Sequence, residues 1–305
     1  MKMTRLLIFT LVLFYVKGFT QTDPLYNQYL FNQNMINPAY TGTYAIFNGT
    51  IMTRAQWAGI KGSPLTTTVS ASTSFLREHL GTGILIVNDR IGINNNSDVQ
   101  GAVSYKLKFL HSGLSFGMQG GVVTYQYNYN QLNLEPNAND PLLTQQQRPN
   151  FTKPTVGAGL FYRADRFYLG ASIPRLMNVS VQDGNASTTI YKRQLYLSGG
   201  VLFDQFEAIK LKTSLLVKVL DKNQSYFDFN TSVLLAETIW AGVSVRNFKT
   251  IGANGILEIS NKFRVGYYYE FPSKTLLGST FGTHEFMLSA DLEIFNGHRA
   301  LRRYF

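Results

Sequence analysis

The chain has 305 residues, a formal net charge of +10 and no cysteine, and it is 45% hydrophobic but only 15% charged. A soluble globular domain usually carries about a quarter charged residues, so this composition is poor in charge without being strongly apolar. The lack of cysteine excludes disulfides and thiolate chemistry. The basic balance could favour nucleic acid or anionic head groups, but the absence of a dense Lys/Arg run argues against nucleic acid.

The first twenty residues have the pattern of a signal peptide. Lys2 and Arg5 form a basic start, an apolar core runs from Leu6 to Val16, and Gly18-Phe19-Thr20 ends the segment with a small-x-small pattern. The alternative is a transmembrane anchor, but the apolar run is shorter than the roughly 18 residues that a membrane helix needs. We therefore predict a cleaved signal over residues 1–20.

Residues 21–43 are rich in Asn, Gln and Tyr and do not alternate between polar and apolar positions. A bland linker would rarely carry so many aromatic and apolar groups. We expect this stretch to fold as a plug-like segment at the periplasmic mouth of the domain that follows. A disordered lead is the alternative.

From residue 44 onward the chain alternates between apolar and polar residues, which is typical of strands. Between Val99 and Phe109 the odd positions are apolar or Gly, whereas the even positions are polar or Ala. Such runs reach the length of about 9–11 residues that a tilted transmembrane strand needs, whereas strands of a soluble sandwich are nearer five or six. Strands are predicted near 44–59, 65–75, 81–88, 97–109, 113–127, 154–163, 167–173, 190–203, 209–219, 225–235, 239–247, 251–260, 263–271 and 283–295. The predicted fold is an all-β transmembrane antiparallel β-barrel of about fourteen strands over residues 44–295.

The connections between these strands fall into two kinds. The connections after even-numbered strands are short, as at Leu110–Ser112 and Ala236–Thr238, whereas all the long ones follow odd-numbered strands. The long ones are Asn128–Lys153, Pro174–Thr189 and Pro272–Gly282. Bacterial barrels have short periplasmic turns and longer external loops, so we expect both termini in the periplasm. The basic tail 296–305, which ends Tyr304-Phe305, follows the last predicted strand.

Charged residues recur on the polar face of the predicted strands. The basic ones are Arg54, Lys106, Lys108, Arg163, Lys210, Lys212, Lys218, Arg246 and Arg264, and the acidic ones are Asp228, Glu258, Glu270, Glu285, Asp291 and Glu293. A Lys or Arg on the lipid face costs about 2–4 kcal/mol at the midplane, so these side chains are expected to point inward. Mixed signs favour a salt-bridged, filled interior over an ion-selective pore.

Catalytic and metal sites find little support. Gly113-Leu114-Ser115-Phe116-Gly117 matches the nucleophile elbow G-x-S-x-G, but that motif needs a turn and a helix, and here it begins a long alternating run. The histidines His79, His111, His284 and His298 are dispersed without ligand spacing. We therefore expect no enzyme, no cofactor and no metal. An outer-membrane hydrolase using Ser115 is one competing function.

Several motifs make the mature chain similar to the PorP/SprF family of the type IX secretion system in Bacteroidota. They are Gln28-Tyr29-Leu30-Phe31-Asn32, Asn37-Pro38-Ala39-Tyr40-Thr41-Gly42, Arg54-Ala55-Gln56-Trp57-Ala58-Gly59-Ile60, Gly62-Ser63-Pro64, Val87-Asn88-Asp89-Arg90-Ile91-Gly92 and Gly282-Thr283-His284-Glu285-Phe286-Met287-Leu288-Ser289. The family often closes in Pro-Arg-Tyr-Phe, whereas this chain has Arg302-Arg303-Tyr304-Phe305.

The resemblance implies an outer-membrane protein that works with the type IX machinery and supports secretion or surface anchoring of a partner, such as a large gliding adhesin. Implied partners are machinery proteins, a cargo C-terminal domain and outer-membrane lipid, but no nucleic acid. The motif residues proposed for structural or partner-contact roles are Asn37, Pro38, Ala39, Tyr40, Arg54, Gln56, Trp57, Asn88, Asp89, His284, Glu285, Tyr304 and Phe305. The alternative function is a channel or transporter for small solutes.

Overall fold

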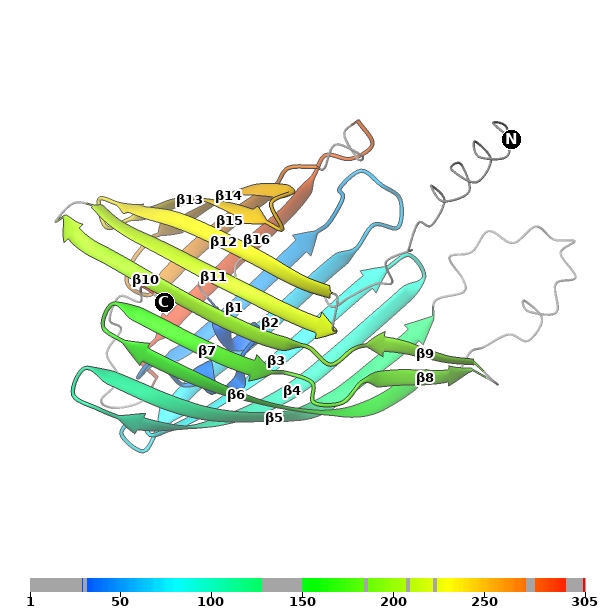
Figure 1. Ribbon diagram of the computed structural model, residues 1–305, viewed down its shortest axis with the longest axis horizontal. Helices are drawn as coiled ribbons and strands as arrows, with labels where there is room; N and C mark the ends of the chain where they lie inside the picture. Colours follow the sequence, from blue (N-terminus) through cyan, green and yellow to red (C-terminus); the bar gives the residue numbers. More distant parts are fainter. Residues whose placement is uncertain are drawn as a thin grey trace, which may run out of the picture.

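The wall of the molecule is a closed barrel. The computed structural model describes Tyr29, residues 32–127, 150–183, 186–206, 209–221, 224–272 and 278–294, and Tyr304. Within these residues, fourteen antiparallel strands form the wall, and β16 pairs with β1 to close it (Figure 1). The wall strands are β1 (Phe47–Ala55), β2 (Leu65–Phe75), β3 (Leu80–Ile91), β4 (Asn94–Lys108), β5 (Ser112–Tyr127), β6 (Phe151–Ala164), β7 (Phe167–Ile173), β10 (Leu195–Phe206), β11 (Ile209–Asp221), β12 (Gln224–Leu235), β13 (Ile239–Arg246), β14 (Thr250–Glu258), β15 (Phe263–Glu270) and β16 (Thr283–Leu292).

Each of the fourteen predicted strands overlaps one wall strand, and the predicted fold class is confirmed. The differences lie at strand ends. The first predicted strand, 44–59, is shorter in the structure because residues 56–59 form a turn in which Trp57 has a φ of 53°. The eighth, predicted over 190–203, is β10 and starts later, at Leu195.

The connection predicted from Pro174 to Thr189 is not a plain loop, which corrects that expectation. It contains most of a second, two-stranded sheet made of β8 (Val179–Asp183) and β9 (Ala186–Tyr191). Figure 1 shows this hairpin projecting from the right-hand end of the barrel. The Asn and Gln content suggested a loop, whereas β-branched residues such as Val179 and Thr189 favour extended backbone.

The two ends of the barrel differ. One end, called here the short-turn end, carries the brief connections 76–79, 109–111, 165–166, 236–238 and 259–262. The other, the long-loop end, carries the connections 56–64, 128–150, 174–194 and 271–282, together with two tight turns. All long connections therefore share one end, as the alternation of connection lengths predicted.

The wall has an apolar outside and a polar inside. On β4, Val99, Val103 and Tyr105 are exposed, whereas the intervening Gln100 and Ser104 are buried. The same alternation places exposed apolar side chains on the outer face of the other strands, because successive strand residues point to opposite faces. The protein's apolar core lies in the lumen, where Phe161, Tyr168 and Trp240 are fully or almost fully buried. No helix in the described part of the chain is long and apolar enough to cross a membrane.

Replacing Val103 tests the lipid-facing assignment. Val103 lies on the outer face of β4 and is 54% exposed. We predict that Val103→Arg lowers the free energy of unfolding by about 2–4 kcal/mol, because a guanidinium near the lipid midplane is costly. The control Val103→Leu should cost less than about 1.5 kcal/mol. Urea titration in lipid vesicles, followed by tryptophan fluorescence, measures both, and equal stabilities would contradict the assignment.

Candidate functional site in the barrel lumen

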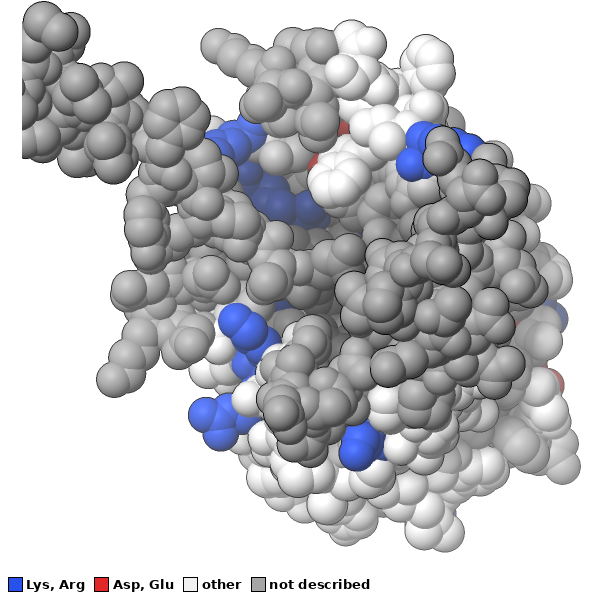
Figure 2. All heavy atoms as spheres, turned by 90° about the vertical axis from the view of Figure 1, so that its right-hand side faces the viewer, with Lys and Arg blue, Asp and Glu red and all other residues white. Residues whose placement is uncertain are grey.

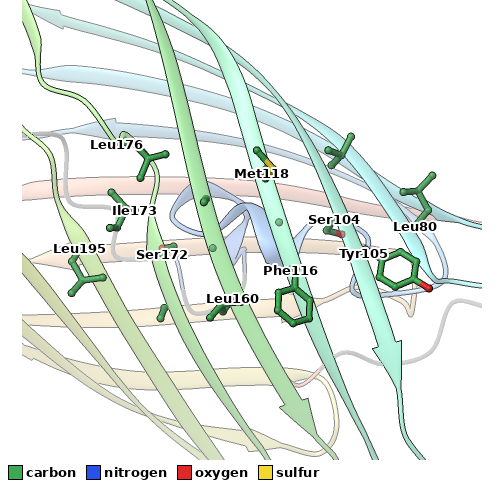
Figure 3. A pocket seen from close by; sticks show the side chains of 15 residues that line it. Leu80, Ser104, Tyr105, Phe116, Met118, Leu160, Ser172, Ile173, Leu176 and Leu195 are labelled. Carbon is green, nitrogen blue, oxygen red and sulfur yellow. The ribbon is translucent and has the colours of Figure 1, made fainter.

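The described residues ahead of β1 lie inside the barrel. Tyr29 and residues 32–43, called here the lumenal segment, are all buried. Two short 3₁₀ turns, η2 (Gln33–Met35) and η3 (Pro38–Tyr40), set its course, and η3 packs against β4, β5 and β6. Figure 3 shows its coiled ribbon directly behind these strands. Residues 21–28, 30 and 31 of the predicted plug-like segment lie outside the described residues.

A row of small side chains on the inner wall makes room for this segment. Gly81, Ser104, Gly117, Gly159 and Ser172 stand opposite one another on β3, β4, β5, β6 and β7, and form one line across five strands, called here the small-residue row. A Cβ at three of these positions would overlap the segment: at Gly81 with Thr41, at Gly117 with Ala39 and at Gly159 with Asn37. The small-residue row therefore lets the backbone of the lumenal segment lie directly against the inner wall.

The serines of the row hold the segment by its backbone. Ser172 Oγ donates to the carbonyl of Ile36 at 2.6 Å, and Ser104 Oγ donates to the carbonyl of Thr41 at 2.5 Å. Beyond the row, Lys106 Nζ donates to the carbonyl of Thr43 at 2.7 Å. These bonds satisfy carbonyls that would otherwise be buried without partners.

Asn37 fixes both the turn and its attachment. Its Oδ1 accepts from the amide of Ala39 at 2.9 Å and caps η3, where Pro38 occupies the first helical position. Its Nδ2 donates to the carbonyl of Leu160 on β6 at 2.9 Å. One side chain therefore sets the conformation of the Asn37–Tyr40 motif and binds it to the wall.

Two further asparagines attach the segment to β2. Asn32 Nδ2 donates to Ser70 Oγ at 2.7 Å, and Asn34 Nδ2 donates to Ser72 Oγ at 3.1 Å. The asparagines of residues 32–43 thus make side-chain hydrogen bonds to the inner wall.

The row also explains the G-x-S-x-G match. Gly117, the last residue of the motif, lies in the small-residue row. Ser115 is buried near the start of β5, where the strand pairs on both sides, opposite Lys106 and Phe161. A nucleophile elbow needs a sharp strand-to-helix turn that exposes the serine. The geometry required of a catalytic Ser115 is absent from this part of β5.

The outer face of the same strands carries an apolar groove. Its volume is about 630 Å³, and Ala158 and Ala171 line it among larger apolar side chains. Figure 3 shows Phe116 and Met118 on β5 among the side chains that border it. Since small residues occupy both faces here, the wall is thin where the lumenal segment packs against it.

A chain of ion pairs runs along the inner wall near the long-loop end, across the neighbouring strands from β1 to β12. Arg54 lies 3.3 Å from Glu285 and 3.6 Å from Glu270, and Arg246 lies 3.0 Å from Glu270 and 2.9 Å from Asp228. These five residues, called here the ion-pair chain, come from β1, β16, β15, β13 and β12. Pairing each charge offsets the large cost of removing it from water.

The lumenal segment reaches this chain as well. The hydroxyl of Tyr29 donates to Asp228 Oδ1 at 3.4 Å. A second pair lies toward the short-turn end, where Arg264 and Asp291 are 2.6 Å apart and Asn48 Nδ2 donates to Asp291 Oδ1 at 2.7 Å. Polar groups at both levels of the lumen therefore find partners within the protein.

Most of the charges predicted to point inward do so. The buried ones are Arg54, Lys106, Lys212, Lys218, Arg264, Asp228, Glu258, Glu285 and Asp291. Lys212 lies 6.0 Å from the ring centroid of Trp240, and the indole of Trp240 donates to Glu258 Oε1 at 2.9 Å. Lys108 and Glu293 are exposed, because they lie at the short-turn rim, and Lys108 pairs there with Glu78 at 2.9 Å.

The motif residues lie in different parts of the structure. Asn37, Pro38, Ala39 and Tyr40 are buried in the lumenal segment, and Arg54, Asp89 and Glu285 are buried in the wall, where Asp89 accepts from Thr66 Oγ1 at 2.6 Å. Gln56 and Trp57 lie in the turn after β1. Asn88 donates to Asn95 and Ser97, and His284 contacts the hydroxyl of Tyr267 at 2.8 Å. Their predicted role as partner contacts stays a prediction.

Tyr304 lies at the short-turn end. Its hydroxyl is 2.7 Å from Lys210 Nζ, which also lies 4.8 Å from the centre of its ring, and the ring packs against the lumenal core. Nearby, the guanidinium of Arg163 lies 4.6 Å from the centre of the Tyr44 ring. Phe305 lies outside the described residues. The charged and aromatic groups at this end therefore narrow the barrel mouth.

Sequence reasoning missed the small-residue row. The available signal was a set of glycines and serines at inward positions of long alternating strands, where a filled lumen would favour larger side chains. Within the described residues, no group of three or more His, Asp or Glu side chains could hold a metal ion.

Gly117→Val tests the close packing of the lumenal segment on the small-residue row. We predict that the new side chain displaces the lumenal segment, exposes residues 32–43 to protease and lowers the free energy of unfolding by about 1–3 kcal/mol, because it overlaps the backbone of Ala39. The control is Gly120→Val on the same strand, where the nearest atom to an added Cβ is 4.0 Å away. Limited proteolysis with mass spectrometry compares the two, and equal protection would refute the close packing.

Arg246→Met tests the ion-pair chain. Removing this guanidinium leaves Asp228 and Glu270 without it in a buried site, and we predict a loss of about 3–5 kcal/mol. The control Arg166→Met breaks a pair in which the arginine side chain is 67% exposed, and it should change stability by no more than about 0.5 kcal/mol. Urea unfolding in vesicles measures both variants. If the two variants lose similarly small amounts of stability, the ion-pair chain contributes little to the free energy of unfolding.

Several solved structures are similar to this chain at low identity. The outer membrane protein Omp33 of Acinetobacter baumannii is 9% identical with a TM-score of 0.45, over 83% of this chain and 99% of that one. The CymD monoaromatic hydrocarbon channel is 9% identical with a TM-score of 0.49, over 88% and 93%. The KdgM porin is 8% identical with a TM-score of 0.40, over 81% and 99%. No curated protein matches the chain.

The family profile of the type IX secretion system membrane protein PorP/SprF matches residues 18–290, which is most of the chain. This match confirms the resemblance that the motifs indicated. With the closed barrel, it supports a location in the outer membrane. The chain belongs to the PorP/SprF family of type IX secretion system membrane proteins.

Proposed function

We propose that this barrel supports secretion or surface anchoring of a partner protein, such as a large gliding adhesin, as an outer-membrane component of the type IX system. One observation carries the proposal beyond the family: the lumen is occupied by the chain's own segment. A wall that holds residues 32–43 on the small-residue row suits a rigid platform for a partner. Binding at the rims and loops, rather than passage through the lumen, is then its mechanism.

The alternative is a channel for small solutes. Channel and porin are the printed names of CymD and KdgM, and they describe those proteins. Two features disfavour this alternative here. The lumenal segment makes hydrogen bonds to β2, β4, β6 and β7. On the opposite part of the wall the ion-pair chain fills the inner face, and Tyr29 of the segment bonds to its Asp228. A selective pore needs a continuous path lined by polar groups.

The proposed orientation follows from the lengths of the connections. Residues 1–20 act as a cleaved signal, both termini lie in the periplasm, and the long-loop end faces outward. The loop 128–153 and the hairpin region 174–189 then meet the exported partner, whereas the short-turn end faces the periplasmic machinery. Loops displayed on a rigid scaffold are common sites of recognition.

The motif residues divide between structure and contact in this proposal. The lumenal segment takes its conformation from Asn37, Pro38, Ala39 and Tyr40. The ion pair between Arg54 and Glu285 stabilises the inner wall of the lumen. Trp57 is 39% exposed at the long-loop end and is the motif residue best placed to contact a partner. The protein acts by binding and is not an enzyme, so Ser115→Ala leaves its function intact.

Deletion of the gene tests the proposal. We predict that it abolishes surface display of one large adhesin or of several cargo proteins, and that the wild-type gene restores it. Immunoblots of surface-shaved cells and culture medium measure display and release. Unchanged secretion together with unchanged surface attachment would rule the proposal out.

Reconstitution separates the two functions. We predict no large, steady conductance for the wild-type protein in planar bilayers, since the lumenal segment and the ion-pair chain occupy the lumen. The conductance of Gly117→Val serves as the comparison, because the new side chain overlaps Ala39 and displaces the lumenal segment. A large steady conductance of the wild-type protein would favour the channel.

A further inference from the structure

The hairpin β8–β9 is fixed to the barrel at its base. Val179 and Tyr191 are buried against Val123 of β5. Arg175 lies 2.5 Å from the buried Asp98, and its guanidinium stacks 4.3 Å from the centre of the Tyr191 ring. The base of the hairpin is therefore pre-organised by apolar packing and a shielded ion pair.

A notch lies between this base and the end of β11. Its volume is about 380 Å³, and it is called here the rim notch; its lining residues are Leu176, Asn178, Thr189, Lys192, Arg193 and Leu220. Asn178 Oδ1 accepts from the amide of Arg193 at 2.7 Å, which fixes the backbone that presents the two cations. Leu220 is half-buried and lies where the pairing of β11 with β12 shifts, between Val219 and Asp221, so the notch lies at the rim of the barrel where β11 ends.

Among the side chains that the structure describes, the lining of the notch has two cations and no acid. Lys192 and Arg193 are exposed, and neither makes an ion pair with a carboxylate in the described part of the chain. Arginine and lysine bind carboxylates through charge-assisted hydrogen bonds, and the guanidinium can do so through two parallel bonds. Leu176 and Leu220 offer apolar contact beside them. This combination fits an acidic group on a chain that also carries apolar side chains.

Other exposed cations of the described chain lie on the same face as the notch. Four further exposed cations, Lys61, Arg90, Lys153 and Lys249, belong to the long-loop end, and Figure 2 shows blue side chains spread over this face. Among the acids whose exposure the structure describes, the exposed ones are Asp165, Glu237 and Glu293, and they lie at the short-turn end. A group of exposed cations raises the local concentration of acidic partners and speeds their association.

We propose that the rim notch binds a carboxylate of a partner polypeptide, either an acidic side chain or a C-terminal carboxylate, through Lys192 and Arg193. The inference rests on the proposed function, since the partner is the protein that the barrel helps to export or anchor. A polypeptide is favoured over a lipid phosphate because the notch lies at the base of a hairpin that projects beyond the end of the barrel, and because Leu176 and Leu220 can contact apolar side chains next to a bound carboxylate.

A binding experiment with the full mature chain in nanodiscs tests the notch. The probes are a fluorescent peptide of alternating Glu and Leu with a free C-terminus, the same peptide amidated at its C-terminus, and a Lys-Leu peptide. We expect fluorescence anisotropy to show binding of the first probe and none of the third. Weaker binding of the amidated peptide assigns the terminal carboxylate, whereas equal binding assigns side-chain carboxylates.

Two double variants locate the site. Lys192→Glu with Arg193→Glu should weaken binding about tenfold or more, because it replaces both cations with repelling charges. Lys61→Glu with Lys249→Glu makes the same change of charge on the same face outside the notch, and it should weaken binding less than about threefold. Equal losses in both variants, or no loss in either, would overturn the proposal. Preferential binding of lipopolysaccharide vesicles through Lys192 and Arg193 would overturn it as well.

A cellular measurement separates this inference from the proposed function. If gene deletion abolishes surface display but the Lys192→Glu, Arg193→Glu variant restores it fully, the notch proposal fails and the function stands. If deletion changes nothing while the Glu-Leu peptide still binds at the notch, the function fails and the notch remains a carboxylate site. Heat-modified gel mobility of the variant confirms that it is folded.

Discussion

The fold depends on one close approach, that of the lumenal segment to the small-residue row. Gly81, Ser104, Gly117, Gly159 and Ser172 form a single line across five strands, and the stretch from Ile36 to Thr41 crosses that line one strand at a time. Backbone can come this near only where no Cβ intervenes. The closeness lets the two serines and Asn37 bond directly to backbone carbonyls. A barrel whose interior would otherwise need many more large side chains is filled by its own N-terminal chain.

The ion-pair chain stabilises charged side chains that the strands direct into the lumen. A strand that spans a membrane turns alternate residues inward, and this sequence puts arginines, lysines and carboxylates at many of those positions. A buried charge is stable only when it is paired, so the register of β12, β13, β15, β16 and β1 has to bring opposite signs together. Packing on one side of the lumen and ion pairs on the other give a closed, rigid interior, and recognition is left to the two ends.

The two ends of the barrel carry different kinds of side chain. The short-turn end has exposed charges of both signs, several of them paired, and aromatic rings such as Tyr44 and Tyr304 at its mouth. The long-loop end has exposed cations, a hairpin fixed by Arg175 and Tyr191, and a notch with two of those cations in its lining. Because charges at opposite ends lie well beyond a Debye length of each other, each end can attract its own partner.

The sequence by itself determined the wall. Strict alternation fixes which face of each strand is apolar, and the lengths of the connections group the long ones at one end, so all fourteen wall strands follow from local pattern. The inward direction of residues such as Arg54 and Glu285 follows from the same periodicity. Tertiary structure alone decided which inward residues meet. The pairing of Arg54 with Glu270, the row that joins Gly81 to Ser172 and the docking of Asn37 on Leu160 link positions far apart in the chain, and they depend on strand register, which composition does not encode. The hairpin β8–β9 was missed because its strands are short and polar and depend on packing against β5 at Val123.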